Sequence, residues 1–290
     1  MEEWYVLTCE QPSDKKNRLL TLYSHKKASI RVAADGGANC LYDAAGKNGD
    51  KYFVSPPPTS CSHEPNHLTN KPTQDDLTAI IGDLDSLTDE TRTYFTTHSS
   101  SPAAKKTLII HDPNQYSTDF GKSVDYLRSS FCSQPGAPRP DIVAIGGLGG
   151  RVDQGLSQLH HLYLFQSSPT YANGRMYLFS GESLTFLLKS GTHKIRVRED
   201  PGQGQGQVTN QSQSQSQSEK KKDVFAKWVG ILPVKEPSRI WTKGLEWDVE
   251  DWPTEFGGQM STSNHVLPET EVVEVRTTRD VLFTIALRDV

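Results

Sequence analysis

The chain has 290 residues, a formal net charge of −4 at pH 7 and a hydrophobic content of 34%. This slight acidity excludes the basic surface on which nucleic-acid binding depends. The first residues lack the apolar run of a secretory signal, and no stretch approaches the roughly 20 apolar residues that span a bilayer. We therefore expect a cytoplasmic protein that engages neither nucleic acid nor a membrane.

Two segments explain the low hydrophobic content. Residues 55–76 contain five prolines, and residues 199–222 alternate glutamine with glycine and serine before three lysines. Such segments bury too little apolar surface to offset the entropy lost on ordering. We interpret the first as a loop insertion and the second as a disordered insertion. The rest of the chain is roughly 39% apolar, or about 46% with glycine, which is normal for globular domains.

The first half of the chain alternates strands with helices. The predicted strands lie at 29–34, 77–81, 108–111 and 141–145. The predicted helices lie at 39–45, at 88–95, from Thr118 or Asp119 through Leu127, and at 152–165. This alternation is typical of an α/β domain with a mainly parallel sheet. We assign it to residues 1–170.

The pattern changes after about residue 174, and no helical period follows. Strands are predicted at 177–179, 184–188, 193–197, 228–232, 239–241, 272–276 and 281–287. Turn signals separate them, so residues 171–290 are expected to form an all-β domain, a sandwich or an open barrel. The Gln/Ser-rich insertion then falls in a hairpin loop, where added length costs little.

Candidate functional residues follow each strand of the first half. These motifs are Asp35-Gly36-Gly37-Ala38-Asn39, Gly82-Asp83-Leu84-Asp85-Ser86, Ser117-Thr118-Asp119-Phe120-Gly121-Lys122 and Gly146-Gly147-Leu148-Gly149-Gly150-Arg151-Val152-Asp153-Gln154. In an open parallel sheet, ligands bind outside the carboxyl ends of the strands, so we expect the motifs to converge there. Each motif taken singly also fits a structural turn or a helix cap.

Together the motifs favour chemistry on a magnesium nucleotide. Carboxylates bind a hard cation, and a glycine-rich turn that opens a helix suits polyphosphate. Lys122 and Arg151 add positive charge for phosphate. The glycine run matches neither G-x-G-x-x-G nor G-x-x-x-x-G-K-[ST], so neither the Rossmann nor the P-loop fingerprint is present.

These motifs resemble those of the thiamine pyrophosphokinase family, and the segment from Asn114 to Asp119 and the insertions resemble its fungal branch. The likeness continues in the second half, through Gly230-Ile231-Leu232-Pro233-Val234, Thr242-Lys243-Gly244-Leu245-Glu246-Trp247 and Phe256-Gly257-Gly258-Gln259-Met260-Ser261-Thr262-Ser263-Asn264. The resemblance implies an α/β catalytic domain that binds ATP, followed by a β-sandwich that binds thiamine. It implies pyrophosphoryl transfer from ATP to the thiamine hydroxyl, giving thiamine diphosphate and AMP in a homodimer with shared active sites.

The resemblance also implies residue roles. Mg²⁺ would be held by Asp83, Asp85 and Asp119, which act with Arg151 and Asp153 in catalysis. ATP would be bound by Asp35, Gly36, Gly37, Asn39, Thr118, Lys122, Gly147, Gly149, Gly150 and Arg151. Thiamine would be bound by Gln115, Asp153, Gln154, Trp247, Ser261, Thr262, Ser263 and Asn264, with Trp247 supplied by the partner subunit.

This sequence departs from the family pattern at Cys40, Asn114 and Tyr116, where arginine and two acids are usual. Three alternatives stay open: a Mg²⁺–ATP transferase acting on another alcohol, an inactive binding module, and an interaction protein built on the Gln/Ser segment. Asp119 and Asp153 are both candidates for the general base.

Overall fold

A computed structural model describes residues 4–8, 28–45, 77–97, 106–130, 139–198 and 223–288. The insertions expected at 55–76 and 199–222 lie outside the described residues. The chain divides into two compact units, Met1–Gly181 and Glu182–Val290. The boundary expected at residue 170 precedes the last strand of the first unit.

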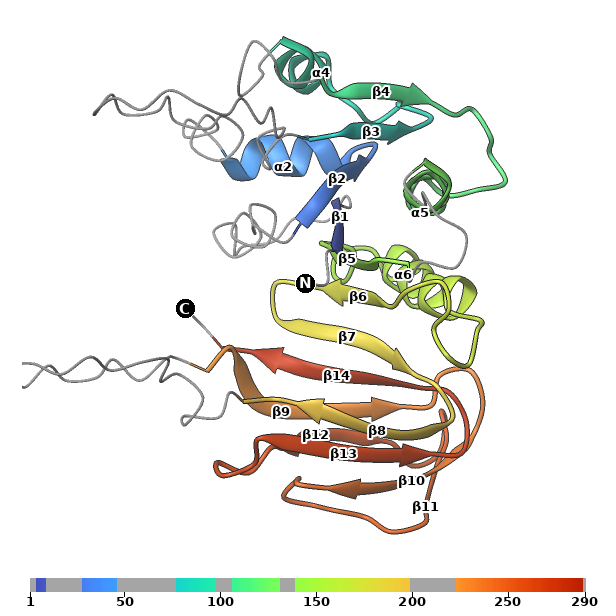
Figure 1. The fold of residues 1–290 in the computed structure, drawn as a ribbon, viewed down its shortest axis with the longest axis vertical. Coiled ribbons are helices and arrows are strands. Elements are labelled where there is room, and N and C mark those ends of the chain that lie inside the picture. The colour runs from blue at the N-terminus through green and yellow to red at the C-terminus, as the bar shows by residue number, and fades with distance from the viewer. Residues whose placement is uncertain are drawn as a thin grey trace, which may run out of the picture. The chain divides into compact units, whose positions relative to one another are not determined.

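The first unit is built on a parallel sheet. Its strands are β1 (Trp4–Thr8), β2 (Ala28–Ala34), β3 (Ala79–Gly82), β4 (Leu108–His111), β5 (Asp141–Ile145) and β6 (Met176–Phe179). Their order is β6-β5-β1-β2-β3-β4, and every pair is parallel (Figure 1). The helices are α2 (Gly37–Ala45), α4 (Asp89–Thr97), α5 (Asp119–Ser130) and α6 (Val152–Phe165). The predicted α/β alternation is confirmed.

The strand order explains how this unit holds together. Ala33 and Ile80, on neighbouring strands β2 and β3, share one buried cluster with Leu41 of α2 and Phe95 of α4. Strand β1, which the sequence pattern did not predict, pairs with both β2 and β5 and so lies inside the sheet. The parallel pairing brings the carboxyl ends of the strands to one edge.

The second unit contains two antiparallel sheets. One has the order β12-β9-β14-β7 and the other β11-β10-β13-β8. The strands are β7 (Ser183–Leu188), β8 (Gly191–Arg196), β9 (Phe225–Leu232), β10 (Ser238–Lys243), β11 (Trp252–Thr254), β12 (Ser261–His265), β13 (Val272–Thr277) and β14 (Val281–Leu287). Ile231 and Phe283 of the first sheet and Ile240, Val273 and Val275 of the second are all fully buried. The predicted sandwich-like domain is confirmed.

Strands β11 and β12 were not predicted. Strand β11 is only three residues long and contains Pro253, and β12 reads Ser-Thr-Ser-Asn-His, so neither carries the apolar alternation that marks a strand. Backbone pairing with β10 and β9 forms them instead. Within the described residues, the helices are too short or too polar to cross a bilayer.

Candidate active site

Three carboxylates converge at the carboxyl edge of the first unit. Asp35 follows β2, and Asp83 and Asp85 follow β3. Each offers one oxygen, and these three oxygens lie within 4.8 Å of one another. Asp35 is 3% exposed, and its Oδ1 has no hydrogen-bond partner among the described residues. Its other oxygen, Oδ2, accepts the backbone N–H of Ser86 at 3.2 Å. A buried, unpaired carboxylate oxygen beside two more carboxylates fits a divalent cation.

The electrostatics of Asp35 support this interpretation. Burial raises the pKa of the Asp35 carboxyl from 3.8 to about 6, and the negative charges of Asp119, Asp85 and Asp83 act in the same direction. The Ser86 N–H opposes this increase only in part. Asp35 also has a φ of +38°, a left-handed backbone that non-glycine residues seldom adopt. Strain and charge repulsion at one residue indicate a site built for a cationic ligand.

Replacing Asp35 by asparagine is expected to stabilise the metal-free chain at neutral pH. A carboxyl whose folded pKa is raised contributes stability only at low pH, and that stability is lost as pH rises through about 6. The amide of the Asp35→Asn variant has no charge to bury, and asparagine tolerates positive φ. We expect a gain of about 2 kcal/mol at pH 7.5 that disappears near pH 4. Thermal melts in EDTA across this range measure it, and a gain that is independent of pH contradicts the assignment.

Asp119 lies beside the acidic cluster formed by Asp35, Asp83 and Asp85, and it has a hydrogen-bond partner outside that cluster. Its Oδ1 accepts the backbone N–H of Asp83 at 3.2 Å and the Lys122 ammonium at 2.9 Å. The Lys122 side chain is only 3% exposed. Sequence motifs grouped Asp119 with Asp83 and Asp85 as metal ligands, whereas the tight group of oxygens here contains Asp35 in its place. Lys122, expected at the nucleotide, neutralises Asp119.

Further hydrogen bonds tie the surrounding loops together. Gln115 Nε2 donates to Asp83 Oδ2 at 3.1 Å, which holds the pKa of Asp83 below its usual value. Asn39 Nδ2 donates to the Ser86 carbonyl at 2.7 Å, and its Oδ1 accepts the Thr88 N–H at 3.2 Å. The structure thus brings Gln115 to the carboxylates and uses Asn39 to join the start of α2 to the loop before α4.

Thr118 caps α5, the helix that carries Asp119. Its Oγ1 accepts the Gly121 N–H at 3.1 Å and lies 3.0 Å from Nε2 of His161. His161 packs against the rings of Phe120 and Phe165, and burial lowers its pKa to about 4. The neutral His161 ring, which belongs to α6, therefore holds the Thr118 hydroxyl in its capping position. Thr118 therefore stabilises the start of α5 and lies next to Asp119 in the chain.

The glycine-rich loop after β5 has the backbone that the sequence predicts. Gly146, Gly147, Gly149 and Gly150 all have positive φ, between 60° and 135°. The loop leads into the N-terminus of α6, at the same sheet edge as the carboxylates. Gly149 and Gly150 are exposed just before the start of α6, whereas the Gly146 N–H donates to the Phe179 carbonyl at 2.9 Å. An exposed glycine backbone at a helix start suits an anion.

Arg151 and Asp153 pair with each other at the start of α6. Nε and Nη2 of Arg151 donate to the Asp153 carboxylate at 3.1 and 2.5 Å. Both side chains are well exposed, and Gln154 beside them is also exposed. The arginine lowers the pKa of Asp153, which makes that carboxylate a weaker base. The guanidinium is available to exchange this partner for a phosphate.

The second unit gathers the remaining predicted residues. Trp247 is 55% exposed, and its ring centroid lies 5.0 Å from that of His265. Asn264 at the end of β12 is bonded to the Trp247 backbone. Thr262 and Ser263 are exposed and Ser261 is half-buried. An exposed indole beside polar side chains fits a flat cationic ligand.

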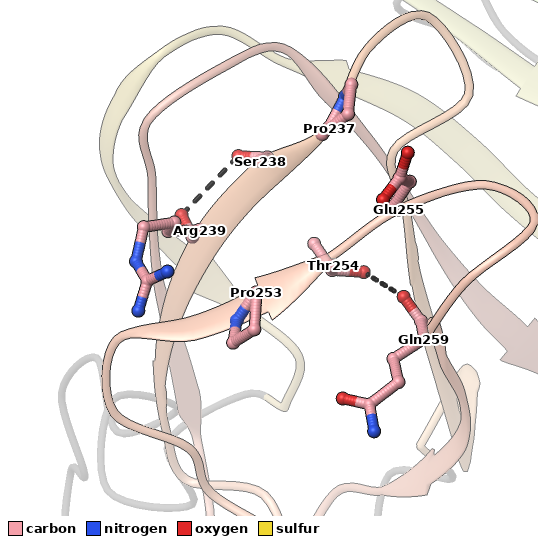
Figure 2. A pocket seen from close by; sticks show the side chains of 7 residues that line it. All are labelled: Pro237, Ser238, Arg239, Pro253, Thr254, Glu255 and Gln259. Atoms are coloured by element: carbon pink, nitrogen blue, oxygen red, sulfur yellow. Dashed lines mark hydrogen bonds between the residues drawn. The ribbon is translucent and has the colours of Figure 1, made fainter.

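The second unit contains two cavities, and one of them is lined by Glu246 and His265, the neighbours of Trp247. A cavity of about 430 Å³, drawn in Figure 2, is lined by Pro237, Ser238, Arg239, Pro253, Thr254, Glu255 and Gln259. Another, of about 610 Å³, is lined by Arg198, Asp223, Ala226, Lys227, Trp228, Glu246, His265, Val266, Leu267, Pro268 and Arg288. Arg239 is neutralised by Asp251, with Nε 2.7 Å from Oδ1. None of the residues proposed from the sequence lines either cavity.

Gly82 and Ser86 belong to a motif that the sequence singled out, but neither was given a role of its own. Ser86 holds Asp35 through its backbone, and Gly82 leaves the space into which Asp35 and Asp119 fit. A glycine as the last residue of a buried strand was the available signal for Gly82. No side-chain pattern could have indicated Ser86, since its contact is made by the main chain.

Comparison with known proteins agrees with the geometry. Residues 22–172 match the family "Thiamin pyrophosphokinase, catalytic domain", and residues 214–282 match "Thiamin pyrophosphokinase, vitamin B1 binding domain". Thiamine pyrophosphokinase 3 of Oryza sativa subsp. japonica is 28% identical over 264 residues, covering 90% of this chain and 80% of its own. Thiamine pyrophosphokinase of Saccharomyces cerevisiae is 26% identical over 279 residues, covering 82% and 72%.

Solved structures share the fold. Thiamin pyrophosphokinase from Candida albicans has a TM-score of 0.70 at 22% identity and covers 99% of this chain and 90% of its own. The yeast enzyme has a TM-score of 0.71 at 23% identity and covers 99% and 87%. The expected fungal likeness is thus confirmed in the fold, whereas the curated sequence relatives are mostly plant enzymes. The chain is an enzyme of the thiamin pyrophosphokinase family, which places it among the kinases of thiamine diphosphate biosynthesis.

Proposed function

We propose that this chain transfers the pyrophosphoryl group of Mg²⁺–ATP to the hydroxyl of thiamine, giving thiamine diphosphate and AMP. The observation that carries the proposal is the buried, unpaired oxygen of Asp35 within reach of Asp83 and Asp85. It lies at the sheet edge where the glycine-rich loop also ends. Carboxylates for a metal and a backbone cradle for phosphates are the parts that phosphoryl chemistry needs.

Asp35, Asp83 and Asp85 would hold the Mg²⁺, with Asp119 beside them. A bound cation would neutralise charge on the phosphate oxygens. It would also relieve the repulsion that raises the Asp35 pKa. Lys122 would hold the Asp119 carboxylate in place through their ion pair, so that Asp119 keeps a fixed position beside the metal ligands.

The glycine-rich loop and Arg151 would bind the polyphosphate of ATP. Backbone N–H groups at the start of α6 favour negative charge. Arg151 is held near the loop by Asp153 and would move onto a phosphate when ATP arrives. Gly36, in the turn before α2, and Gly37, the first residue of α2, would let the nucleotide approach the backbone closely.

Each unit holds residues that we propose to bind thiamine. Its cationic thiazolium suits the exposed face of Trp247. Ser261, Thr262 and Ser263 would supply polar contacts to the pyrimidine ring, with Gln115, Asp153 and Gln154 nearer the reacting hydroxyl. We propose that the enzyme is a homodimer in which Trp247 reaches the site of the partner subunit, as the family resemblance implies. Sedimentation at equilibrium should then give twice the chain mass of 32.2 kDa.

The purified full chain, incubated with thiamine, ATP and Mg²⁺, is expected to form thiamine diphosphate and AMP in equal amounts. Anion-exchange chromatography of both nucleotide and thiamine products measures the reaction, and EDTA should abolish it. The formation of ADP would indicate transfer of a single phosphoryl group and contradict the proposal. A chain that hydrolyses ATP but leaves thiamine unchanged would favour the alternative that another small alcohol is the acceptor.

A further inference from the structure

The turn that carries Trp247 is fixed by hydrogen bonds between its main chain and the Asp248 side chain. The Asp248 carboxylate accepts the N–H groups of Gly244 and Leu245, at 2.9 and 3.1 Å. Gly244 has a φ of +98°, and its missing Cβ would lie 2.9 Å from the side chain of Thr270. The turn is therefore tightly closed, yet the Trp247 indole remains more than half exposed.

Asn264 holds the backbone of Trp247 on both sides. Its Nδ2 donates to the Trp247 carbonyl at 2.9 Å, and its Oδ1 accepts the Trp247 N–H at 3.2 Å. Oδ1 also accepts the N–H of His265 at 2.8 Å. An amide oxygen has two lone pairs, so this acceptor is fully used. Asn264 is only 5% exposed, which leaves little of it for a ligand.

A bulge in β12 places Asn264 in this position. The pairing of β12 with β9 shifts between Ser261 and Asn264, and Ser263 has a φ of +56°. Such a bulge redirects the following side chain. Thr262 and Ser263 stay exposed while Asn264 is buried against the turn. His265, the next residue, places its ring against Trp247 and its Nδ1 on the Glu246 carboxylate.

We propose that Asn264 is a positioning residue for thiamine, which acts by fixing the orientation of Trp247 rather than by contacting the substrate. The inference rests on the proposed function, in which Trp247 is the aromatic face for the thiazolium. It replaces the expectation that Asn264 reads the pyrimidine ring. A pre-oriented indole loses less entropy when a ligand stacks on it, so losing the clamp weakens thiamine binding selectively.

A double-mutant cycle on the full chain tests this inference. Asn264→Ala and Trp247→Ala should each lower kcat/KM for thiamine about tenfold, mainly through KM, and leave the KM for ATP within about twofold. If Asn264 acts through Trp247, the double variant should match Trp247→Ala within about twofold. A double variant about tenfold worse than Trp247→Ala overturns the inference, because Asn264 would then contact thiamine independently. An unaffected KM for thiamine in either single variant also overturns it.

A matched control separates positioning from general damage. Ser238 is also 5% exposed, and its Oγ lies 2.8 Å from Thr277 Oγ1, in a contact that does not involve Trp247. Ser238→Ala should lower the melting temperature yet leave both KM values unchanged. If Asn264→Ala fails to fold, Asn264→Asp takes its place in the cycle with the same expected outcomes. Asn264→Asp keeps both accepted hydrogen bonds and loses the donated one. If the unaltered chain produces no thiamine diphosphate, the proposed function is wrong. If it produces thiamine diphosphate but the effects of the two substitutions add, only the inference about Asn264 is wrong.

Discussion

Replacing Asp83 by alanine is expected to lower kcat by about 10³-fold or more while the chain stays folded. Asp83 contributes one of the three clustered carboxylate oxygens and also receives Gln115. Its removal takes away both a proposed metal ligand and the anchor for a residue expected near thiamine. The effect on folding is small because the side chain is only partly buried and its loss relieves repulsion with Asp35. The free energy of unfolding should change by less than about 1 kcal/mol.

The measurement is the initial rate of AMP formation as Mg²⁺ is varied. Asp83→Asn preserves shape and removes the charge, so it should share the loss of rate and need far more Mg²⁺ for half-maximal activity. Asp89, an exposed acid in the first turn of α4, provides the matched control. Asp89→Asn makes the same charge change outside the cluster and should leave the rate unchanged. Normal turnover and normal Mg²⁺ dependence in Asp83→Ala would exclude Asp83 from the site.

The fold of the first unit could be predicted largely from local sequence. Strands β2 to β5 read as short apolar runs, and each is followed by glycine or aspartate and then by a helical pattern. Strand β1 escaped prediction because Trp4–Thr8 is followed by no such helical pattern within the described residues. Only the pairing with β2 and β5, which joins distant parts of the chain, reveals it.

The convergence of the acidic motifs was also predictable, since parallel strands end at one edge. The contacts that each acidic residue makes were not predictable. Asp119 and Lys122 lie three residues apart in the first turn of α5, a spacing that allows an ion pair, yet a lysine near a phosphate site suggests a phosphate ligand equally well. The structure adds that Lys122 is buried in an ion pair with Asp119 and that Asp35 is buried as well, and such burial depends on packing that the local sequence does not show.

In the second unit, the sequence motif around Asn264 could not indicate that Asn264 is buried. A run of Ser-Thr-Ser-Asn reads as a polar, exposed binding segment. The bulge at Ser263 reverses that expectation for Asn264, which is buried while Thr262 and Ser263 stay exposed. Bulges depend on how two strands pair, so a single segment does not reveal them.

Replacing Gly82 by alanine is expected to lower kcat/KM for Mg²⁺–ATP about 10²-fold. A Cβ at this position would lie 2.8 Å from Cβ of Asp35 and 2.9 Å from Cγ of Asp119, closer than real contacts allow. Asp119 cannot rotate away cheaply, because Lys122 and the Asp83 N–H both hold its Oδ1. The turn after β2 or the start of α5 must therefore move. Overpacking of this kind should also cost about 1–3 kcal/mol of unfolding free energy.

Activity measured well below the melting temperature separates the two effects of the Gly82 substitution. Gly155 provides the control, because a Cβ there would meet nothing within 4 Å. Gly155→Ala lies within α6 and should raise stability by roughly 0.5–1 kcal/mol with turnover unchanged. Gly82→Ala should instead need more Mg²⁺ for half-maximal rate, since the substitution displaces the carboxylates from one another. A Gly82→Ala enzyme with normal Mg²⁺ dependence would mean that the close approach of Asp35 and Asp119 serves folding alone, and the metal would then be held without Asp35.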